Sequence, residues 1–304
     1  MLKLDGQLIS ILGGGGFVGR YVTERLLALG ARVRVAQRNP QQANFLRPLA
    51  NLGQIQFVRA DVRDPAGVAR AIGGSHAVIN LVGSFTEMQA VQADGAGHVA
   101  QAAAQAGASM LVHLSAIGAD PNSPSLYGRT KASGEAAVRG AFPQAAILRP
   151  SVIFGREDQF VNRLGRMVQH KLVPVVAGSA RFQPVYVGDV AAAVVAALAP
   201  QHAGRTYELA GPTAYTMDGL LHWLAHYTGH RPRFFPVSGR LIASLPFSPI
   251  SKDQLAMLRV DNVPADGALG LVDLNITPTP LENVAHDWLV LYREQGRFAD
   301  KKAV

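Results

Sequence analysis

The sequence of 304 residues predicts an α/β fold, in which a doubly wound parallel sheet is followed by a small, mostly helical C-terminal domain. Short apolar runs alternate with longer helical patterns through residues 1–150, which is typical of βαβ units. Runs such as INLVG and MLVHLS are apolar nearly throughout, as expected for strands that helices cover on both faces. A glycine turn directly after the first run is typical of the Rossmann form of this fold.

Each apolar run is an expected strand, and the helical patterns lie between and after the runs. The expected strands are Gln7–Leu12, Ala31–Ala36, Gln54–Arg59, Ala77–Val82, Met110–Leu114, Ala145–Leu148 and Thr206–Gly211. The expected helices are Phe17–Leu29, Gln41–Leu49, Pro65–Ile72, Ala90–Ala106, Leu126–Ala141, Phe160–His170, Asp189–Ala199, Met217–Thr228 and Pro280–Gln295. Because the pattern loosens after Pro150, we expect a Rossmann core of residues 1–155 to which 183–212 return. Residues 156–182 and 213–304 would form a smaller domain that meets the substrate or a partner.

The composition excludes several classes of protein. Hydrophobic residues make up 48% and charged residues 16% of the chain, which excludes a disordered chain, collagen and a coiled coil. Cysteine is absent, which excludes a disulfide scaffold, a thiolate metal site and a cysteine nucleophile. The N-terminal segment does not resemble a signal peptide, and the longest small-apolar run, Ala191–Ala199, is too short to span a bilayer. We therefore expect a cytoplasmic protein.

The net charge of +8 is concentrated at the start of the chain. Residues 1–70 hold ten basic and four acidic residues, a net charge of +6, and the remainder is close to neutral. Recognition of nucleic acid requires basic residues on one face together with a docking element, and the sequence offers neither. The charge instead suits an anionic ligand bound by the first quarter of the chain.

Glycines recur every three residues in the turn after the first strand. Gly13, Gly16 and Gly19 permit a sharp turn, close approach of backbone N–H groups to a pyrophosphate, and tight packing of the next helix. That helix begins with Phe17, Val18, Gly19 and Arg20, which we expect beside the phosphates. The position of the turn between a strand and a helix favours a dinucleotide site over a turn without a ligand.

The end of the second strand decides which dinucleotide is favoured. NAD sites usually place a carboxylate there to bind the ribose, whereas NADP sites place an arginine. Here Gln37, Arg38 and Asn39 stand at this end, so NADP(H) is favoured over NAD(H), with a solvated Arg38 as the alternative. Ligands lie beyond the carboxyl ends of such strands. We therefore expect adenine at Asp61 and Val62 and expect Leu81, Val82 and Gly83 to line the cofactor.

Tyr127 and Lys131 lie four residues apart at the start of an expected helix, which puts both side chains on one face. A neighbouring ammonium lowers the pKa of a tyrosine by favouring the phenolate. Such a pair can give a proton to a carbonyl while a nicotinamide delivers hydride. The Y-x-x-x-K spacing is common by itself and is informative here because it follows the glycine turn and the fifth strand.

Together these features resemble the short-chain dehydrogenase/reductase superfamily in its extended and atypical branches. The segments YGRTKASGE, AFPQAAILRPSVIFGREDQF and QPVYVGDV, with ITPTPLE near the C-terminus, look like those of the nucleotide-binding accessory subunits of respiratory complex I (NADH:ubiquinone oxidoreductase). The resemblance implies a Rossmann domain, a small C-terminal domain and tightly bound NADPH without an established turnover role. It places pyrophosphate at Gly13, Gly16 and Gly19, the 2′-phosphate at Arg38, adenine at Asp61 and Val62, the nicotinamide ribose at Tyr127 and Lys131, and the nicotinamide near Pro150 and Ser151.

The sequence departs from catalytic members of the superfamily just after the fifth strand. Reductases and epimerases have a Ser or Thr there that orients the substrate carbonyl. Ser115 is present, but Ala116 and Ile117 occupy the positions where the hydroxyl more often stands. Ser115 is thus a candidate catalytic residue, and its alternatives are to cap the strand end or to touch the cofactor.

Three other features have a structural interpretation beside a functional one. His222, His226 and His230 recur every four residues, but Gly229 is expected to end the helix before His230 and no carboxylate lies suitably near in sequence, so we expect no metal. Glu157 and Asp158 are expected to pair with arginines or cap a helix. The segment Arg231–Pro249 mixes aromatic, basic and proline residues, as in a packed lid or in a surface that meets a membrane or partner.

Three hypotheses about function remain. In the first, the protein resembles the complex I accessory subunit, holds NADP(H) as a structural or sensory group, and lies at the inner face of a membrane near a respiratory-chain partner. In the second, it is an active NADP(H)-dependent reductase, epimerase or dehydratase that uses Tyr127, Lys131 and Ser115. In the third, it is a cofactor-sensing regulator. No motif identifies a substrate.

Overall fold

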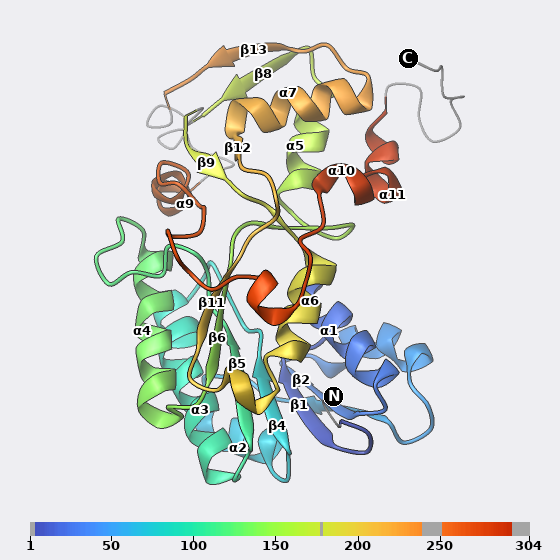
Figure 1. Cartoon of the computed structure of the whole chain (residues 1–304), viewed down its shortest axis with the longest axis vertical. Helices are drawn as coiled ribbons and strands as arrows, with labels where there is room; N and C mark the ends of the chain where they lie inside the picture. Colours follow the sequence, from blue (N-terminus) through green and yellow to red (C-terminus); the bar gives the residue numbers. More distant parts are fainter. Residues whose placement is uncertain (1–3, 177–178, 239–250, 294–304) are drawn as a thin grey trace. The chain divides into compact units, whose positions relative to one another are not determined.

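Seven parallel strands form one sheet, in the order β11-β6-β5-β4-β1-β2-β3 (Figure 1). Their bounds are β1 Leu8–Leu12, β2 Arg32–Gln37, β3 Ile55–Arg59, β4 Ala77–Asn80, β5 Met110–Leu114, β6 Ala146–Pro150 and β11 Thr206–Leu209. The strand order reverses between β1 and β4, and ligands of doubly wound sheets bind outside the carboxyl ends of the strands at this point. The predicted doubly wound sheet is confirmed.

The computed structural model describes residues 4–176, 179–238 and 251–293. Within them the chain forms two units. The first unit consists of the chain up to Pro150, Val187–Leu209 and Ala265–Thr277. The second consists of Ser151–Tyr186, Ala210–Pro264 and the chain from Pro278 onward.

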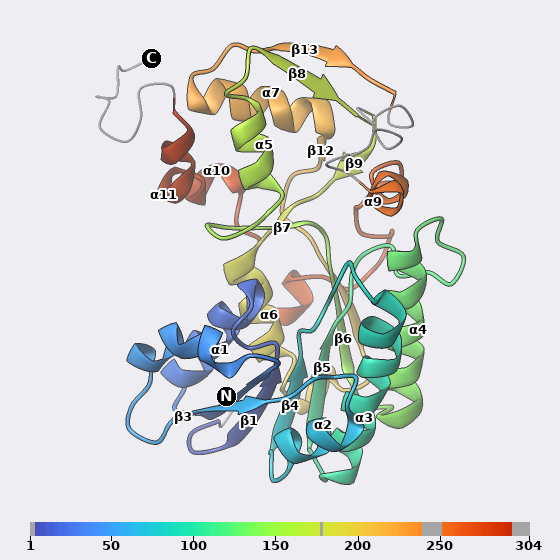
Figure 2. The same cartoon turned by 180° about the vertical axis from the view of Figure 1, so that it is seen from behind.

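Helices cover both faces of the sheet in the first unit. Figures 1 and 2 show α2, α3 and α4 over one face and α1 and α6 over the other. The bounds are α1 Phe17–Ala28, α2 Pro65–Ile72, α3 Gly95–Gln105, α4 Leu126–Ala141 and α6 Val187–Ala196, with 3₁₀ turns at Pro40–Leu49, Pro200–His202 and Val272–Leu274. Ile72, Val78, Val99 and Leu111 are fully buried between α2, α3 and the sheet. This packing explains why the strands lack alternating polarity.

Two predicted helices of the first unit take a different form. The segment predicted as a helix at Gln41–Leu49 is a 3₁₀ helix, Pro40–Leu49, and it contains Pro48, which lacks the N–H that an α-helix requires at that position. The predicted helix Ala90–Ala106 begins with a π-helical turn, Gln89–Asp94, before α3. This turn brings the Gln92 carbonyl so close to α4 that a side chain at Gly134 would collide with it.

In its described residues, the second unit combines short helices with three pairs of short strands. Its helices are α5 Val161–Met167, α7 Met217–Thr228, α9 Lys252–Met257, α10 Leu281–Val284 and α11 His286–Leu289, with a 3₁₀ turn at Val290–Tyr292. The strand pairs are β7 Ile153–Phe154 with β10 Val185–Tyr186, β9 Arg181–Phe182 with β12 Tyr215–Thr216, and β8 Leu172–Val175 with β13 Arg233–Pro236. The predicted helix Pro280–Gln295 is therefore divided into three pieces as far as Tyr292, and Gln295 lies outside the described residues.

The segment Arg231–Pro249 is described only in part. Residues 233–236 form β13, while residues 239–250 lie outside the described part of the chain. None of the helices in the described ranges has both the length and the apolar character to span a bilayer.

Candidate functional site

The glycine turn leaves the start of α1 open for an anion. Gly13 has φ +83°, a left-handed conformation that favours glycine, and its N–H donates to the Ala36 carbonyl at 2.9 Å. A Cβ at Gly19 would collide with the carbonyl oxygen of Gly13, so the close approach of α1 to the turn requires glycine. Gly16 precedes the helix, and no side chain in the described residues caps it. The unpaired N–H groups and the positive end of the helix dipole fit a pyrophosphate.

Gln37 lies over this turn at the end of β2. Its Oε1 accepts a hydrogen bond from the N–H of Gly15 at 3.1 Å, and its Nε2 donates to the Asn39 carbonyl at 2.6 Å. A neutral amide thus stands at the strand end where NAD sites usually place a carboxylate. Arg38, the next residue, is exposed.

Arg20 packs its guanidinium against an aromatic ring of the 3₁₀ helix Pro40–Leu49. The Arg20 guanidinium carbon lies 4.6 Å from the centre of the Phe45 ring, which is within the range of a cation–π contact. Arg20 therefore has a defined position one residue after the third glycine of the turn.

The residues predicted to meet adenine follow β3. Asp61 accepts hydrogen bonds from the Arg63 guanidinium, which lower the pKa of its carboxyl to about 2. The carbonyl of Val62 accepts a bond from His98 Nδ1 at 2.8 Å. These hydrogen bonds fix the turn at the carboxyl end of the strand.

The segment after β4 lies beside the glycine turn. The N–H of Leu81 donates to the Leu12 carbonyl at 3.0 Å, and the N–H of Val82 donates to Asn80 Oδ1 at 3.1 Å. Gly83, which follows, is exposed. Leu81, Val82 and Gly83 therefore lie at the point where the strand order reverses.

Tyr127 and Lys131 lie on the first two turns of α4, which Ser125 caps by accepting a hydrogen bond from the N–H of Gly128. Lys131 is 4% exposed, and its Nζ donates to the Leu114 carbonyl at 3.1 Å. The same Nζ lies 5.8 Å from the centre of the Tyr127 ring. The pair is thus brought together at the carboxyl end of β5, as the spacing predicts.

Burial acts on the two groups in opposite directions. It raises the pKa of Tyr127 to about 12 and lowers the pKa of Lys131 to about 8, because each group loses the hydration that its charged form needs. The expectation that the neighbouring ammonium lowers the pKa of Tyr127 is therefore wrong for this structure: burial raises it, and Tyr127 is protonated at neutral pH. A protonated phenol is a hydrogen-bond donor, whether to a ribose or to a substrate oxygen.

Gln92 is a candidate residue that the sequence analysis missed. It is 1% exposed, its Nε2 donates to Thr130 Oγ1 at 3.2 Å, and its Oε1 has no hydrogen-bond partner among the described residues. A Cβ built on Gly83 would lie 3.7 Å from Lys131 Nζ and 3.9 Å from Gln92 Oε1, so both polar atoms lie near that glycine. A buried acceptor without a partner is costly and fits a site for a hydroxyl donor of a ligand. The sequence feature that could have identified Gln92 is that it is a polar residue on the apolar face of the predicted helix Ala90–Ala106.

Ser115 lies directly after β5 and is also buried. Its N–H donates to the Leu148 carbonyl at 2.7 Å, while its Oγ finds no partner within the part of the chain that is described. Its hydroxyl therefore does not cap the strand. Pro150 ends β6 in the first unit, and Ser151 begins the second unit, where its Oγ donates to Asn262 Oδ1 at 2.6 Å.

His113, on β5, is held neutral. Burial, together with the nearby Lys131 ammonium, lowers its pKa to about 3, and its Nδ1 accepts a hydrogen bond from the Asn80 amide at 3.2 Å. A neutral imidazole adds no second positive charge beside Lys131.

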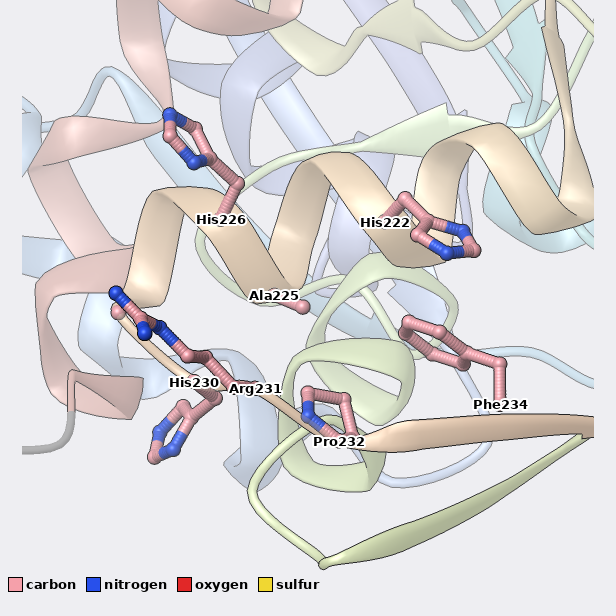
Figure 3. Close-up of a pocket in the computed structure, with 8 residues that line it drawn as sticks. His222, Ala225, His226, His230, Arg231, Pro232 and Phe234 are labelled. Carbon is pink, nitrogen blue, oxygen red and sulfur yellow. The ribbon is translucent and has the colours of Figure 1, made fainter.

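A cavity of about 400 Å³ in the second unit is lined by His222 and His226 of α7 and by His230, which follows the helix (Figure 3). Figure 3 shows the rings of His222 and His226 directed away from each other. His230 Nε2 donates to the Tyr292 carbonyl at 2.8 Å. No group of three His, Asp or Glu side chains in the described ranges could hold a metal ion.

Asp158 stabilises the loop before α5. Its carboxylate accepts hydrogen bonds from the N–H groups of Gly155 at 3.1 Å and Asn162 at 3.2 Å. Burial raises the pKa of this carboxyl. Its contacts are those of a helix cap, with the backbone as partner.

Comparison with known proteins places this geometry in a family. The model of the "NAD dependent epimerase/dehydratase family" matches residues 9–210. The chain is 35% identical over 299 residues to the mouse protein "NADH dehydrogenase [ubiquinone] 1 alpha subcomplex subunit 9, mitochondrial", covering 92% of this chain and 79% of the relative. It is 31% identical over 234 residues to the "Ceramide reductase" of Caulobacter vibrioides, covering 74% and 72% of the two chains.

Solved structures share the fold. An NADPH-dependent quinone oxidoreductase of Escherichia coli in complex with NADPH superposes with a TM-score of 0.73 at 24% identity, covering 91% of this chain and 99% of that one. The resemblance to complex I accessory subunits and to extended short-chain dehydrogenases is thus confirmed.

The buried Lys131 ammonium predicts a pH dependence of stability. Its pKa lies near 8 in the folded protein and near 10.5 when unfolded, so the folded state binds fewer protons between these values. The free energy of unfolding of the cofactor-free protein should therefore rise by about 2 kcal/mol between about pH 7.5 and about pH 9.5 relative to a Lys131→Met variant. Tyr127 opposes this rise only above its unfolded pKa, near 10.

Urea denaturation of both proteins at several pH values measures the difference. Other titrating groups contribute equally to both curves. Parallel curves would show that Lys131 carries its ordinary pKa in the folded state.

Proposed function

The chain belongs to the NAD dependent epimerase/dehydratase family, and from this premise we propose that its first unit binds NADP(H) and holds it as a structural or sensory group. The main support for this proposal is the set of residues at the end of β2. Gln37 there is engaged with the glycine turn, Arg38 is exposed, and no carboxylate stands at the strand end to bind a ribose 2′-hydroxyl. A guanidinium gives the 2′-phosphate of NADP paired, charge-assisted hydrogen bonds.

The other residues of the site fit the rest of the dinucleotide. The open start of α1 fits the pyrophosphate, and Asp61 and Val62 lie where adenine is expected. Gln92 Oε1 and Lys131 Nζ, both buried near Gly83, offer an acceptor and a donor to the nicotinamide ribose. The ribose would thus satisfy a buried oxygen that has no partner among the described residues.

Two observations support a nucleotide that stays bound as a structural or sensory group and is not consumed in a reaction. Ala116 and Ile117 stand where catalytic members more often have a hydroxyl, and the Phe85 ring covers the Tyr127 ring at 4.9 Å. The relative at 35% identity is named as a subunit of NADH dehydrogenase, so a partner in the respiratory chain is part of the proposal.

An active reductase is the second candidate, and the position of Tyr127 beside the Lys131 ammonium at the carboxyl end of β5 favours it. When bound, the nicotinamide supplies a hydride for a substrate carbonyl. Tyr127 would donate its proton to the carbonyl oxygen, Lys131 would favour the resulting phenolate, and Ser115 Oγ would orient the carbonyl. The relative named as a ceramide reductase is consistent with such chemistry in this family.

The second unit offers a surface for a membrane. Leu172 of β8 is 61% exposed and Phe235 of β13 is 41% exposed. Arg233 pairs in register with Leu172, so these side chains share one face of the β8–β13 pair. Lys171 and Arg231 flank it, and residues 166–176 and 229–238 contain no acidic residue. Exposed apolar side chains beside basic ones suit an anionic bilayer surface, so we place the protein peripherally at a membrane.

Replacing Arg38 tests the choice of nucleotide. Arg38→Gln should raise the Kd for NADPH about tenfold to a hundredfold, because a charge-assisted bond to the 2′-phosphate is lost, and should leave the Kd for NADH nearly unchanged. Arg32→Gln, an exposed arginine at the opposite end of β2, is the matched control. Fluorescence titration measures both constants, and equal losses for the two nucleotides would refute the assignment.

Replacing Tyr127 separates the two candidate functions. For a held cofactor, neither the wild type nor Tyr127→Phe should oxidise NADPH with any member of a panel of carbonyl compounds, quinones and nucleotide sugars. The loss of one hydrogen bond to the ribose should raise the Kd of the variant for NADPH only severalfold. The Phe variant retains an aromatic ring for the stack with Phe85. Turnover by the wild type that Tyr127→Phe abolishes, with no larger loss of NADPH affinity, would establish the active reductase instead.

Vesicle binding tests the surface of the second unit. The protein should sediment with vesicles that contain anionic phospholipid and not with neutral ones, and Phe235→Ser with Arg233→Gln should reduce sedimentation severalfold. Leu52→Ser, which removes a fully exposed apolar side chain of the first unit, is the control. Sedimentation that these two substitutions leave unchanged would exclude this face.

A further inference from the structure

Arg63 joins two segments that the cofactor site depends on. Its Nη2 lies 2.6 Å from Asp61 Oδ2, and its Nη1 lies 2.8 Å from Glu87 Oε1. Asp61 belongs to the turn after β3, and Glu87 belongs to the loop after β4, residues 83–88. The Arg63 guanidinium therefore links Asp61, where adenine is expected, to Glu87 in the loop that follows Gly83.

The same loop is tied at a second point to the expected nicotinamide end. Phe85 stacks on the ring of Tyr127 with an interplanar angle of 20°, although it is 54% exposed. An aromatic side chain with half its surface in water is held here by the stack and not by the core. The loop thus reaches from the turn after β3 to the start of α4.

Glu87 has a backbone conformation that needs support from its contacts within the loop. Its φ of +49° lies in the left-handed region, which is uncommon for residues other than glycine. Its carbonyl accepts the N–H of Val91 at 3.0 Å, directly before the π-helical turn that carries Gln92. Loss of the contact with Arg63 would remove a restraint that favours this conformation and would free the loop to move.

We propose that the Arg63–Glu87 ion pair and the Phe85–Tyr127 stack form a clasp that retains the dinucleotide, with Arg63, Glu87 and Phe85 as positioning residues that set its rate of release. The inference rests on the proposed binding of NADP(H). Both contacts hold the loop beside the two expected ends of the dinucleotide, so the opening of either contact should speed its release. Retention of this kind suits a cofactor that is held rather than exchanged at each turnover.

The clasp is tested by the release of NADPH, measured by stopped-flow displacement with excess NADP⁺. Glu87→Gln and Phe85→Ala should each release NADPH about threefold faster or more, in line with the strength of an exposed ion pair for the first variant and of an aromatic stack for the second. Glu87→Lys should release it faster still, because it repels Arg63, whereas Phe85→Tyr, which keeps the stack, should match the wild type.

Two controls separate a clasp from a general loss of stability. Arg70→Gln removes another exposed ion pair of the first unit, Arg70 with Asp64 at 3.8 Å, and should leave release unchanged. The Tm of each cofactor-free variant should equal that of the wild type, because the replaced side chains, Glu87 and Phe85, are both exposed.

The possible outcomes distinguish failure of the clasp from failure of the proposed binding of NADP(H). Unchanged release rates in variants that still bind NADPH would overturn the clasp and leave the proposed function standing. Faster release only in variants with a lowered Tm would also overturn it. A wild-type protein that binds no NADPH would overturn both.

Discussion

The close approach of α1 to the glycine turn is the constraint on which the cofactor site depends. Because a side chain at Gly19 would collide with the Gly13 carbonyl oxygen, only glycine lets the helix begin directly at the end of β1. The helix then presents its first N–H groups at the point where the strand order reverses. Gln37, Asp61 and Gly83 come to the same edge of the sheet because parallel strands end together there.

A second close approach organises the other end of the site. Gly134 on α4 allows the Gln92 carbonyl to lie against the helix, and the π-helical turn there directs Gln92 toward Lys131 and Gly83. Lys131 in turn donates to the Leu114 carbonyl and is fixed beside β5. Two glycines on different helices thus place an anion site and a buried polar pair at one edge, which is the arrangement a dinucleotide needs.

The sequence predicted the parts of this arrangement that depend on local patterns. The apolar runs located β1 to β6 closely, and the glycine and Tyr/Lys spacings located α1 and α4. The π-helical turn, the position of Gln92 and the Arg63–Glu87 pair could not be predicted, because each depends on contacts between segments far apart in the sequence. The two-residue strands of the second unit are too short to show the alternation of apolar and polar residues that identifies a strand. Gln41–Leu49 was predicted as an α-helix although Pro48 already argued against it.

The nucleotide that the protein carries tests the central claim most directly. Mass spectrometry of the supernatant from freshly purified, denatured protein identifies it without an assay for activity. The account predicts NADP⁺ or NADPH in amounts approaching one per chain, held by the open start of α1 and by Arg38. Recovery of NAD⁺ or NADH instead would contradict the role of Arg38 and the proposed choice of cofactor.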